Sequence, residues 1–367
     1  MKKLIALLLA LVMVIGLVAC GNKAEAPEAP KADAPAAAPE APEADAPADA
    51  PEAPAELTFA IVPKSAGNPY NEREASGFEQ GCAALGVKSI VQYPEDTSAE
   101  AQINVINNLV AQGVNAIAVA ANDAEALEST LEAAKAAGIV VVSLDSDAKG
   151  SQLFVNQAGV SEVAQVLVDS VYEMSEGAGE FAVLSASSTA TNQNSWIAAM
   201  KTIIDGDVKY ADLVWVETVY GDDESQKSYA LSESLMTNYA NLEVICCPTT
   251  VGVLACAQAV QNAGSSIKVA GLGLPSEMNG YVGEGLPCPY MYLWNPIEVG
   301  ETAAYAIQAI IDGLTTGTVD EEFTAGNGKT YTVLAADTSV GVHSTQIIVG
   351  PPYSFTAENI AEWATVY

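Results

Sequence analysis

The chain has 367 residues, a length that predicts two domains, and its 46 acidic against 14 basic residues give a formal net charge of −32. So large an excess of negative charge repels phosphate backbones and anionic lipids, which argues against nucleic-acid binding. The single histidine, His343, disfavours metal sites built from histidines and catalysis by a Ser-His or Cys-His pair.

The N-terminus predicts an export signal. Lys2 and Lys3 precede an apolar run that is shorter than the roughly 20 residues of a membrane-spanning helix. The run ends in Leu17-Val18-Ala19-Cys20-Gly21, which resembles the bacterial lipobox, whose cysteine receives a diacylglycerol. We therefore expect residues 1–19 to be a lipoprotein signal peptide and Cys20 to be the lipidated residue.

The next segment predicts a tether. Residues 22–56 are nearly all Ala, Pro, Glu and Asp, so they lack the large apolar side chains that would offset the entropy lost on folding. At roughly 3.1 Å per residue in a polyproline conformation, the segment could reach on the order of 100 Å. We expect residues 20–56 to hold a soluble body outside the cell, anchored to the outer face of a bacterial membrane.

From Leu57 onward, segments with strand character alternate with segments of helical periodicity. Thr97-Ser98-Ala99-Glu100 resembles a capping box, and Asp123 could cap the helix after it. The strands that we expect are Leu57–Val62, Asn115–Ala120, Ile139–Ser143, Phe181–Ser185, Leu213–Val219, Leu242–Cys247, Ile267–Gly271 and Tyr290–Leu293. Such alternation predicts an α/β fold with parallel sheets covered by helices on both faces, here repeated in two similar lobes.

Polar residues follow these strands where each strand ends. The turn after the first strand carries Lys64, Asn68 and Tyr70 but no G-x-G-x-x-G nucleotide-binding pattern. Carboxylates and amides at the other strand ends, such as Asp145 and Asn192, suit the vicinal hydroxyls of a small polar ligand. Aromatic side chains such as Trp294 could cover the C–H face of a sugar ring. Each of these residues could instead be an ordinary turn or capping residue.

The residues do not predict a metal or a cofactor. Asp145–Gly150 begins like a calcium-binding loop, but Lys149 stands at a ligand position and the pattern fails. The five cysteines after Cys20 form no C-x-x-C pair, and we expect them to be buried free thiols, although a disulfide stays open.

A set of ordered motifs resembles the type I periplasmic-binding-protein family, the substrate-binding lipoproteins of ABC sugar importers, and within it the L-rhamnose-binding and autoinducer-2-binding branch. The motifs are Phe59–Asn68 (FAIVPKSAGN), Ser143–Asp147 (SLDSD), Phe154–Gln157 (FVNQ), Thr191–Trp196 (TNQNSW), Tyr220–Ser228 (YGDDESQKS), Pro248–Gly252 (PTTVG), Gly271–Pro275 (GLGLP) and Leu293–Pro296 (LWNP).

The resemblance implies two Rossmann-like lobes joined by three hinge crossings that close on a ligand. The N-terminal lobe would comprise residues 57–157 and about 294–336, and the C-terminal lobe residues 158–293 and about 337–367. The implied partners are a small sugar and the permease and ATPase subunits of an ABC importer. We expect a monomer that is not an enzyme.

The motifs also imply the ligand-binding residues. We expect these to be Lys64, Asn68, Tyr70, Asp145, Asn192, Gln193, Pro248, Thr250, Trp294 and Asn295. Autoinducer-2 binders are expected to carry Asp-Gln and Pro-Asp-Ala where this chain has Asn192-Gln193 and Pro248-Thr249-Thr250, so the pattern favours L-rhamnose. Leu144 and Asn71 depart from both patterns, which leaves a related sugar or autoinducer-2 open.

Three other functions compete with sugar import. An enzyme on this fold would need a nucleophile elbow, a phosphate loop or a metal cluster, and the sequence has none of these motifs. A sensor that presents its closed form to a membrane receptor would use the same site. A sugar-responsive repressor shares the fold, but the lipobox and the lack of a basic DNA-binding segment argue against it.

Overall fold

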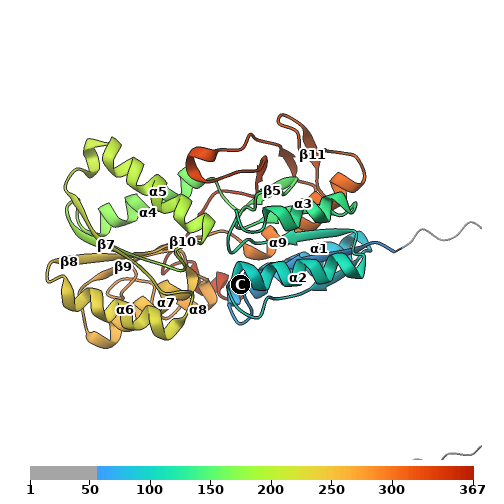
Figure 1. Cartoon of the computed structure of the whole chain (residues 1–367). Helices are drawn as coiled ribbons and strands as arrows, with labels where there is room; N and C mark the ends of the chain where they lie inside the picture. Colours follow the sequence, from blue (N-terminus) through green and yellow to red (C-terminus); the bar gives the residue numbers. More distant parts are fainter. Residues whose placement is uncertain (1–55) are drawn as a thin grey trace, which may run out of the picture. The chain divides into compact units, whose positions relative to one another are not determined.

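The computed structural model describes residues 56–367, so the expected signal peptide, Cys20 and nearly all of the tether lie outside the described residues. Figure 1 shows two α/β lobes in the described part of the chain, each built around a parallel sheet with helices on both faces. The α/β class and the parallel pairing that the sequence predicts are therefore confirmed.

The sheet of the first lobe has six parallel strands. In spatial order they are β13 (Gln346–Ile348), β5 (Leu153–Asn156), β4 (Val140–Leu144), β3 (Ala116–Val119), β1 (Thr58–Val62) and β2 (Lys88–Val91). The helices of this lobe are α1 (Pro69–Leu85), α2 (Ala99–Gln112), α3 (Glu128–Ala136) and α9 (Pro296–Ile311).

Alternation along the strands explains why both faces of this sheet are covered. Phe59 and Ile61 belong to the apolar cluster that includes residues of α1 and α9, whereas Ala60 and Val62 belong to the cluster formed with α2 and α3. Successive side chains of a strand point to opposite faces, so an unbroken apolar run can fill two helix-covered layers at once.

The second lobe repeats this plan. Its parallel strands, in spatial order, are β7 (Leu213–Tyr220), β6 (Gly179–Ser185), β8 (Leu242–Cys247) and β9 (Lys268–Gly271). In Figure 1, α4 (Val160–Met174) and α5 (Thr191–Gly206) cover one face. The other face is covered by α6 (Ser225–Asn238) and α7 (Thr250–Ala263). Two further short helices are α8 (Pro275–Met278) and α10 (Ile360–Trp363).

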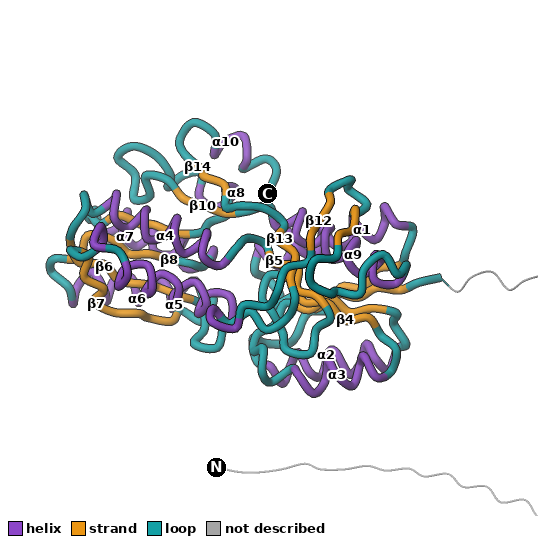
Figure 2. The backbone as a smooth tube through the Cα atoms, turned by 90° about the horizontal axis from the view of Figure 1, so that it is seen from above, coloured by secondary structure: helices purple, strands orange, loops and turns teal. Residues whose placement is uncertain are grey.

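Shorter strands complete the two lobes. β10 (Met291–Leu293) pairs antiparallel with β14 (Tyr353–Phe355), and a bridge from Leu272 to Tyr292 joins this pair to β9. Figure 2 shows β10, β14, α8 and α10 gathered together at the second lobe. β11 (Glu322–Thr324) and β12 (Thr330–Thr332) form a hairpin.

The chain passes between the lobes three times, and the last crossing corrects the expected domain boundary. The family resemblance implies that about residues 337–367 belong to the C-terminal lobe. β13 instead pairs with β5 in the first sheet, with Gln346 opposite Phe154, whereas β14 and α10 join the second lobe. The crossing therefore falls between Ile348 and Tyr353, because pairing with β5 places the short apolar run at 346–348 in the first lobe.

The sequence predicted the ends of α2 correctly but not the start of the next helix. Ser98 caps α2 by accepting a hydrogen bond from the backbone N–H of Ala101, and Gly113 ends that helix in a left-handed conformation. Asp123 does not cap the next helix, because α3 begins only at Glu128. Its carboxylate instead accepts hydrogen bonds from the backbone N–H groups of Glu125 and Ala126, which stabilises a turn after β3.

The five cysteines of the described residues are free and buried, as expected. None of the helices within residues 56–367 has both the length and the apolar composition needed to cross a membrane. Over the same range, no group of three or more His, Cys, Asp and Glu side chains is arranged to hold a metal ion.

Candidate ligand-binding site between the lobes

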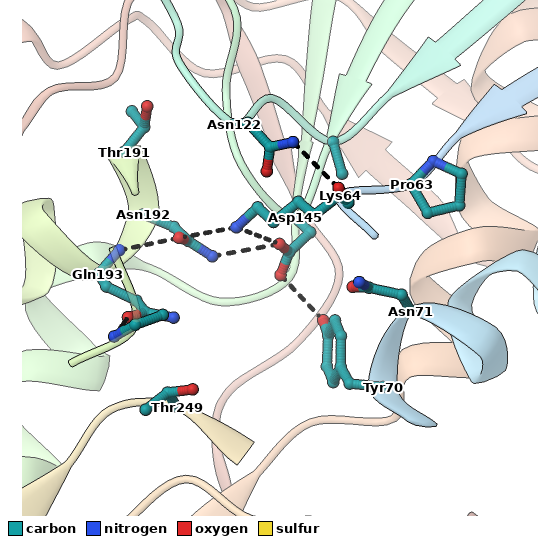
Figure 3. A network of polar contacts seen from close by, with 12 residues as sticks. Pro63, Lys64, Tyr70, Asn71, Asn122, Asp145, Thr191, Asn192, Gln193 and Thr249 are labelled. Atoms are coloured by element: carbon teal, nitrogen blue, oxygen red, sulfur yellow. Dashed lines mark hydrogen bonds and ion pairs between the residues drawn. The ribbon is translucent and has the colours of Figure 1, made fainter. Parts of the chain in front are cut away.

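Lys64 links the two lobes. It follows β1, and its backbone carbonyl accepts a hydrogen bond from the Asn122 side chain after β3 (3.0 Å). Its ammonium group lies 3.0 Å from the carboxylate of Asp145 in the first lobe and donates to the amide oxygen of Asn192 in the second (3.0 Å; Figure 3). Lys64 is buried, so these charged hydrogen bonds operate in a medium of low polarity.

Asp145 is the centre of the polar network. It directly follows β4 and has a φ of 58°, a left-handed conformation that Asp adopts more readily than most residues. One carboxylate oxygen accepts a hydrogen bond from the Tyr70 hydroxyl (3.0 Å), and the other accepts one from the Asn192 amide (3.2 Å) and pairs with Lys64. Asp145 is only 4% exposed, so both oxygens are held in fixed directions.

The second lobe contributes the first turn of α5. Asn192 faces Lys64 and Asp145, and the adjacent Gln193 points into the same space in Figure 3. The Gln193 side-chain oxygen accepts hydrogen bonds from the Ser185 hydroxyl (2.7 Å) and the Ala186 backbone N–H (2.8 Å) at the end of β6. This anchoring fixes the orientation of the amide, and Gln193 lines the pocket.

Aromatic side chains form one wall. The Trp294 indole N–H donates to the Tyr70 hydroxyl (2.7 Å), which extends the network by one further bond. The Trp196 and Trp294 rings lie 5.6 Å apart between centroids, and Tyr70 meets Trp294 edge to face. All three rings are buried, which gives the site apolar faces of the kind that pack against sugar C–H groups.

These groups surround one pocket between the lobes. Its lining residues are Lys64, Asn68, Tyr70, Asn71, Asp145, Asn192, Gln193, Trp196, Asp223, Pro248, Thr249, Thr250, Leu272, Leu293 and Trp294. The structure thus brings nine of the ten residues expected from the sequence to one place.

Asn295 is the exception. Its side chain accepts a hydrogen bond from the Ile297 backbone N–H (3.0 Å) and caps α9, and it does not line the pocket. The sequence already contains the signal for this role, because an Asn directly before a Pro that opens an apolar helical pattern is a strong N-cap.

Sequence reasoning missed Trp196 and Asp223 as pocket residues. Asp223 accepts a hydrogen bond from the Thr249 hydroxyl (2.8 Å), and burial raises the pKa of its carboxyl. Asp222-Asp223 is a pair of acids after a strand, but nothing in the sequence shows which of the two faces the pocket. Trp196 lies one turn after Asn192 on α5. Helical spacing from Asn192 could therefore have identified Trp196 as a pocket residue.

Burial also changes the acidity of two groups on α1. Burial, with the Asp145 carboxylate beside it, raises the pKa of the Tyr70 hydroxyl well above its ordinary value and keeps it protonated as a donor. Burial raises the pKa of Glu74 as well, assisted by the Asp145 carboxylate and opposed by Lys64. Glu74 is fully buried, and neither of its carboxyl oxygens has a hydrogen-bond partner among residues 56–367.

Comparison with known proteins agrees with this architecture. The sequence profile described as "Periplasmic binding protein domain" matches residues 59–315, which is more than half of the chain. The chain belongs to the periplasmic binding protein family. A solved ABC transporter solute-binding protein of this family, from Clostridium phytofermentas with bound L-rhamnose, is 47% identical, with a TM-score of 0.81 over 85% of this chain and 99% of that one.

Two further comparisons reach more distant proteins. The chain is 25% identical to the D-ribose/D-allose-binding protein of Pseudomonas aeruginosa over 58% of its own length and 66% of that protein. LsrB from Clostridium saccharobutylicum, solved in complex with AI-2, is 24% identical, with a TM-score of 0.76 over 83% of this chain and 99% of that one. The two-lobed periplasmic binding protein fold predicted from the sequence is therefore confirmed.

Proposed function

We propose that this periplasmic binding protein captures a small sugar between its lobes and delivers it to an ABC importer, with L-rhamnose as the first candidate. The observation that carries the proposal is the network in which Lys64 and Asp145 of one lobe meet Asn192 of the other. A fixed carboxylate, ammonium and amide beside aromatic faces match the alternating hydroxyl and C–H surfaces of a monosaccharide.

The same network suggests how binding closes the lobes. Sugar hydroxyls donate to the Asp145 carboxylate and accept from Lys64 and the Gln193 amide, so groups of both lobes bond to one molecule. A ligand that contacts both lobes stabilises the closed arrangement through contacts that the open arrangement cannot make. The closed protein is then the form that permease subunits would recognise.

Two positions favour L-rhamnose over autoinducer-2. Asn192 and Thr250 both line the pocket, and each stands where autoinducer-2 binders are expected to differ. An amide at 192 donates as well as accepts, whereas an Asp would only accept. The solved relative of 47% identity contains L-rhamnose, which supports the same choice. Uptake or sensing of autoinducer-2 is the alternative.

We further propose lipidation at Cys20, attachment to a bacterial membrane on its extracytoplasmic side (the outer face of the cell membrane in a single-membraned cell) and a monomeric state. The lipobox residues and the Ala/Pro/Glu-rich segment after them support the anchor. We also propose that the protein binds its ligand without turning it over, because the proteins that it resembles are described as solute-binding and sugar-binding proteins.

A thermal-unfolding panel tests the ligand assignment. The protein would be heated with L-rhamnose, autoinducer-2, D-ribose and D-arabinose, and we expect L-rhamnose to give the largest rise in Tm because it binds only the folded state. Asn192→Asp and Thr250→Ala should reduce the rise with L-rhamnose more than the rise with autoinducer-2. A larger shift with autoinducer-2 in the unmodified protein would overturn the rhamnose assignment.

A further inference from the structure

A second cavity lies behind the candidate sugar site, at the hinge. It is small, with room for about one water, and it shares Asp145, Asn192 and Trp196 with the sugar pocket. Its other walls include Asn156 and Gln157 of the first lobe and Thr191 and Ser195 of α5 in the second. The cavity therefore has walls from both lobes. It lies on the other side of Asp145 and Asn192 from the sugar pocket.

Gln157 is the unusual wall of this cavity. It is fully buried, and neither its side-chain nitrogen nor its side-chain oxygen has a hydrogen-bond partner among residues 56–367. Buried amides in native proteins are almost always hydrogen-bonded to protein or to ordered water. A cavity with several polar walls around an unpartnered amide is the setting in which water is retained.

Gln157 also lies at the hinge between the lobes. It directly follows β5 at the first crossing between the lobes, and its backbone carbonyl accepts a hydrogen bond from Gly350 at the third crossing (3.3 Å). The neighbouring Asn156 carbonyl accepts one from Val349 (2.9 Å). A molecule bonded to the Gln157 side chain would thus connect two hinge strands to the rear of the sugar site.

We propose that Gln157 holds ordered water in this hinge cavity, and that the water links the hinge to Asp145 and Asn192 when the lobes close. Gln157 is then a positioning residue for ligand binding, acting through water and without touching the sugar. The expected effect of Gln157 on affinity rests on the proposed sugar-binding function. The presence of water at Gln157 does not depend on which sugar is bound.

A crystal structure of the protein with L-rhamnose, at a resolution that places waters, tests the site directly. We expect a water bonded to the Gln157 amide and to Asp145 or Asn192. A Gln157 amide that contacts the sugar itself, or a cavity without ordered water, would overturn the proposal. If L-rhamnose does not bind, the proposed sugar is wrong, and water at Gln157 in the sugar-free protein decides the inference alone.

Substitutions provide a second readout. Gln157→Leu should weaken L-rhamnose binding about tenfold in calorimetry, with little change in the Tm of the ligand-free protein, because no protein hydrogen bond is lost. Gln157→Asn should recover most of the affinity, since it keeps the amide and leaves room for water. Unchanged affinity in Gln157→Leu, or no recovery in Gln157→Asn, would contradict the proposed role.

Gln102 is the matched control. It is an equally buried glutamine near the same site, but its amide donates to the Ala120 carbonyl (2.7 Å) and accepts from the Asn122 backbone N–H (2.8 Å). Gln102→Leu should therefore lower the Tm of the ligand-free protein, unlike Gln157→Leu. Equal losses of Tm in the two variants would show that Gln157 is a structural residue bonded to protein.

Discussion

At the scale of single residues, Asp145 combines the most roles. It pairs with Lys64, accepts from Tyr70 and Asn192, and adopts a left-handed backbone conformation after β4. Replacement by Ala would change both the charge and the backbone, because Ala disfavours positive φ. Asn tolerates the same backbone and has nearly the same shape, so Asp145→Asn isolates the charge.

We predict that Asp145→Asn weakens sugar binding by about 1–3 kcal/mol, roughly 5- to 150-fold, because Lys64 loses its ion pair and the ligand loses a charged acceptor. Calorimetric titration measures the change. Asp320→Asn is the control, since Asp320 is an exposed aspartate with a similar φ of 69° outside the pocket. Equal affinities in Asp145→Asn and the unmodified protein would exclude Asp145 from the site.

The buried Glu74 predicts an unusual pH dependence of stability. Its pKa in the folded protein is raised above the ordinary 4.5, so the folded state holds a proton that the unfolded chain releases. The neutral Glu74 carboxyl makes its full contribution to the free energy of unfolding below about pH 4.5. As the pH rises toward the folded-state pKa, the free energy of unfolding falls by about 1.4 kcal/mol per pH unit.

Glu74→Gln removes this dependence. We predict that the variant and the unmodified protein differ little near pH 4.5, and that the advantage of the variant in unfolding free energy grows from pH 5 to pH 8. Urea denaturation across that range measures it, with the exposed Glu72→Gln of the same helix as control. A difference between variant and unmodified protein that stays constant with pH would contradict a neutral Glu74.

The sequence could indicate the chemistry of the site but not its contacts. Lys64, Asp145 and Asn192 each follow a strand or open a helix, which is visible in the chain, and parallel strand ends must converge at one edge. Asn192 bonds across the lobes to Asp145, 47 residues away in the sequence, and to Lys64, 128 residues away. No local sequence pattern encodes contacts over such separations. Ligand contact by these residues remains a prediction.

At the scale of elements, the packing of α1 against α9 determines how the first lobe is held together. Two glycines allow the helices to approach closely. A Cβ on Gly300 would lie 1.9 Å from the Glu74 carbonyl oxygen, and one on Gly77 would lie 1.9 Å from that of Ile297. Both contacts involve backbone atoms, so no side-chain rotation could relieve them.

We therefore predict that Gly300→Ala destabilises the protein by about 1–3 kcal/mol through overpacking, with a matching fall in Tm. Gly206→Ala in α5 is the control, because a Cβ there meets no atom within 4 Å, and it should leave stability unchanged or slightly higher. Thermal unfolding of both variants is the measurement. Equal stabilities would mean that the helices can separate without loss of packing.

The sequence predicted well those strands that have an apolar run bounded by turn residues. It did not predict the strands whose place depends on pairing with a distant strand. The β8 range matched the expected Leu242–Cys247, since its apolar run is bounded by clear turn residues. β13 is a strand of three residues whose place in the first sheet follows from pairing with β5, nearly two hundred residues earlier. Local propensity carries little information about such a partner, which is why the last lobe boundary was misplaced.

At the scale of the whole molecule, ligand binding between the lobes requires the lobes to move. The interlobe bonds of Asn192 with Lys64 and Asp145 define a closed arrangement, and a sugar must enter before the arrangement forms around it. We predict that saturating L-rhamnose lowers the radius of gyration measured by small-angle X-ray scattering, and that Asp145→Asn shows a smaller decrease at the same sugar concentration. An unchanged radius in the unmodified protein would contradict closure on the ligand.

A calorimetric titration of L-rhamnose into the purified protein tests most directly whether the pocket between the lobes binds this sugar. We expect one site per chain with a dissociation constant in the micromolar range or tighter, and clear weakening in Asp145→Asn. Binding of autoinducer-2 but not L-rhamnose would retain the site and change the ligand. Failure of both ligands to bind the unmodified protein, or binding that Asp145→Asn leaves intact, would contradict the assignment of this site.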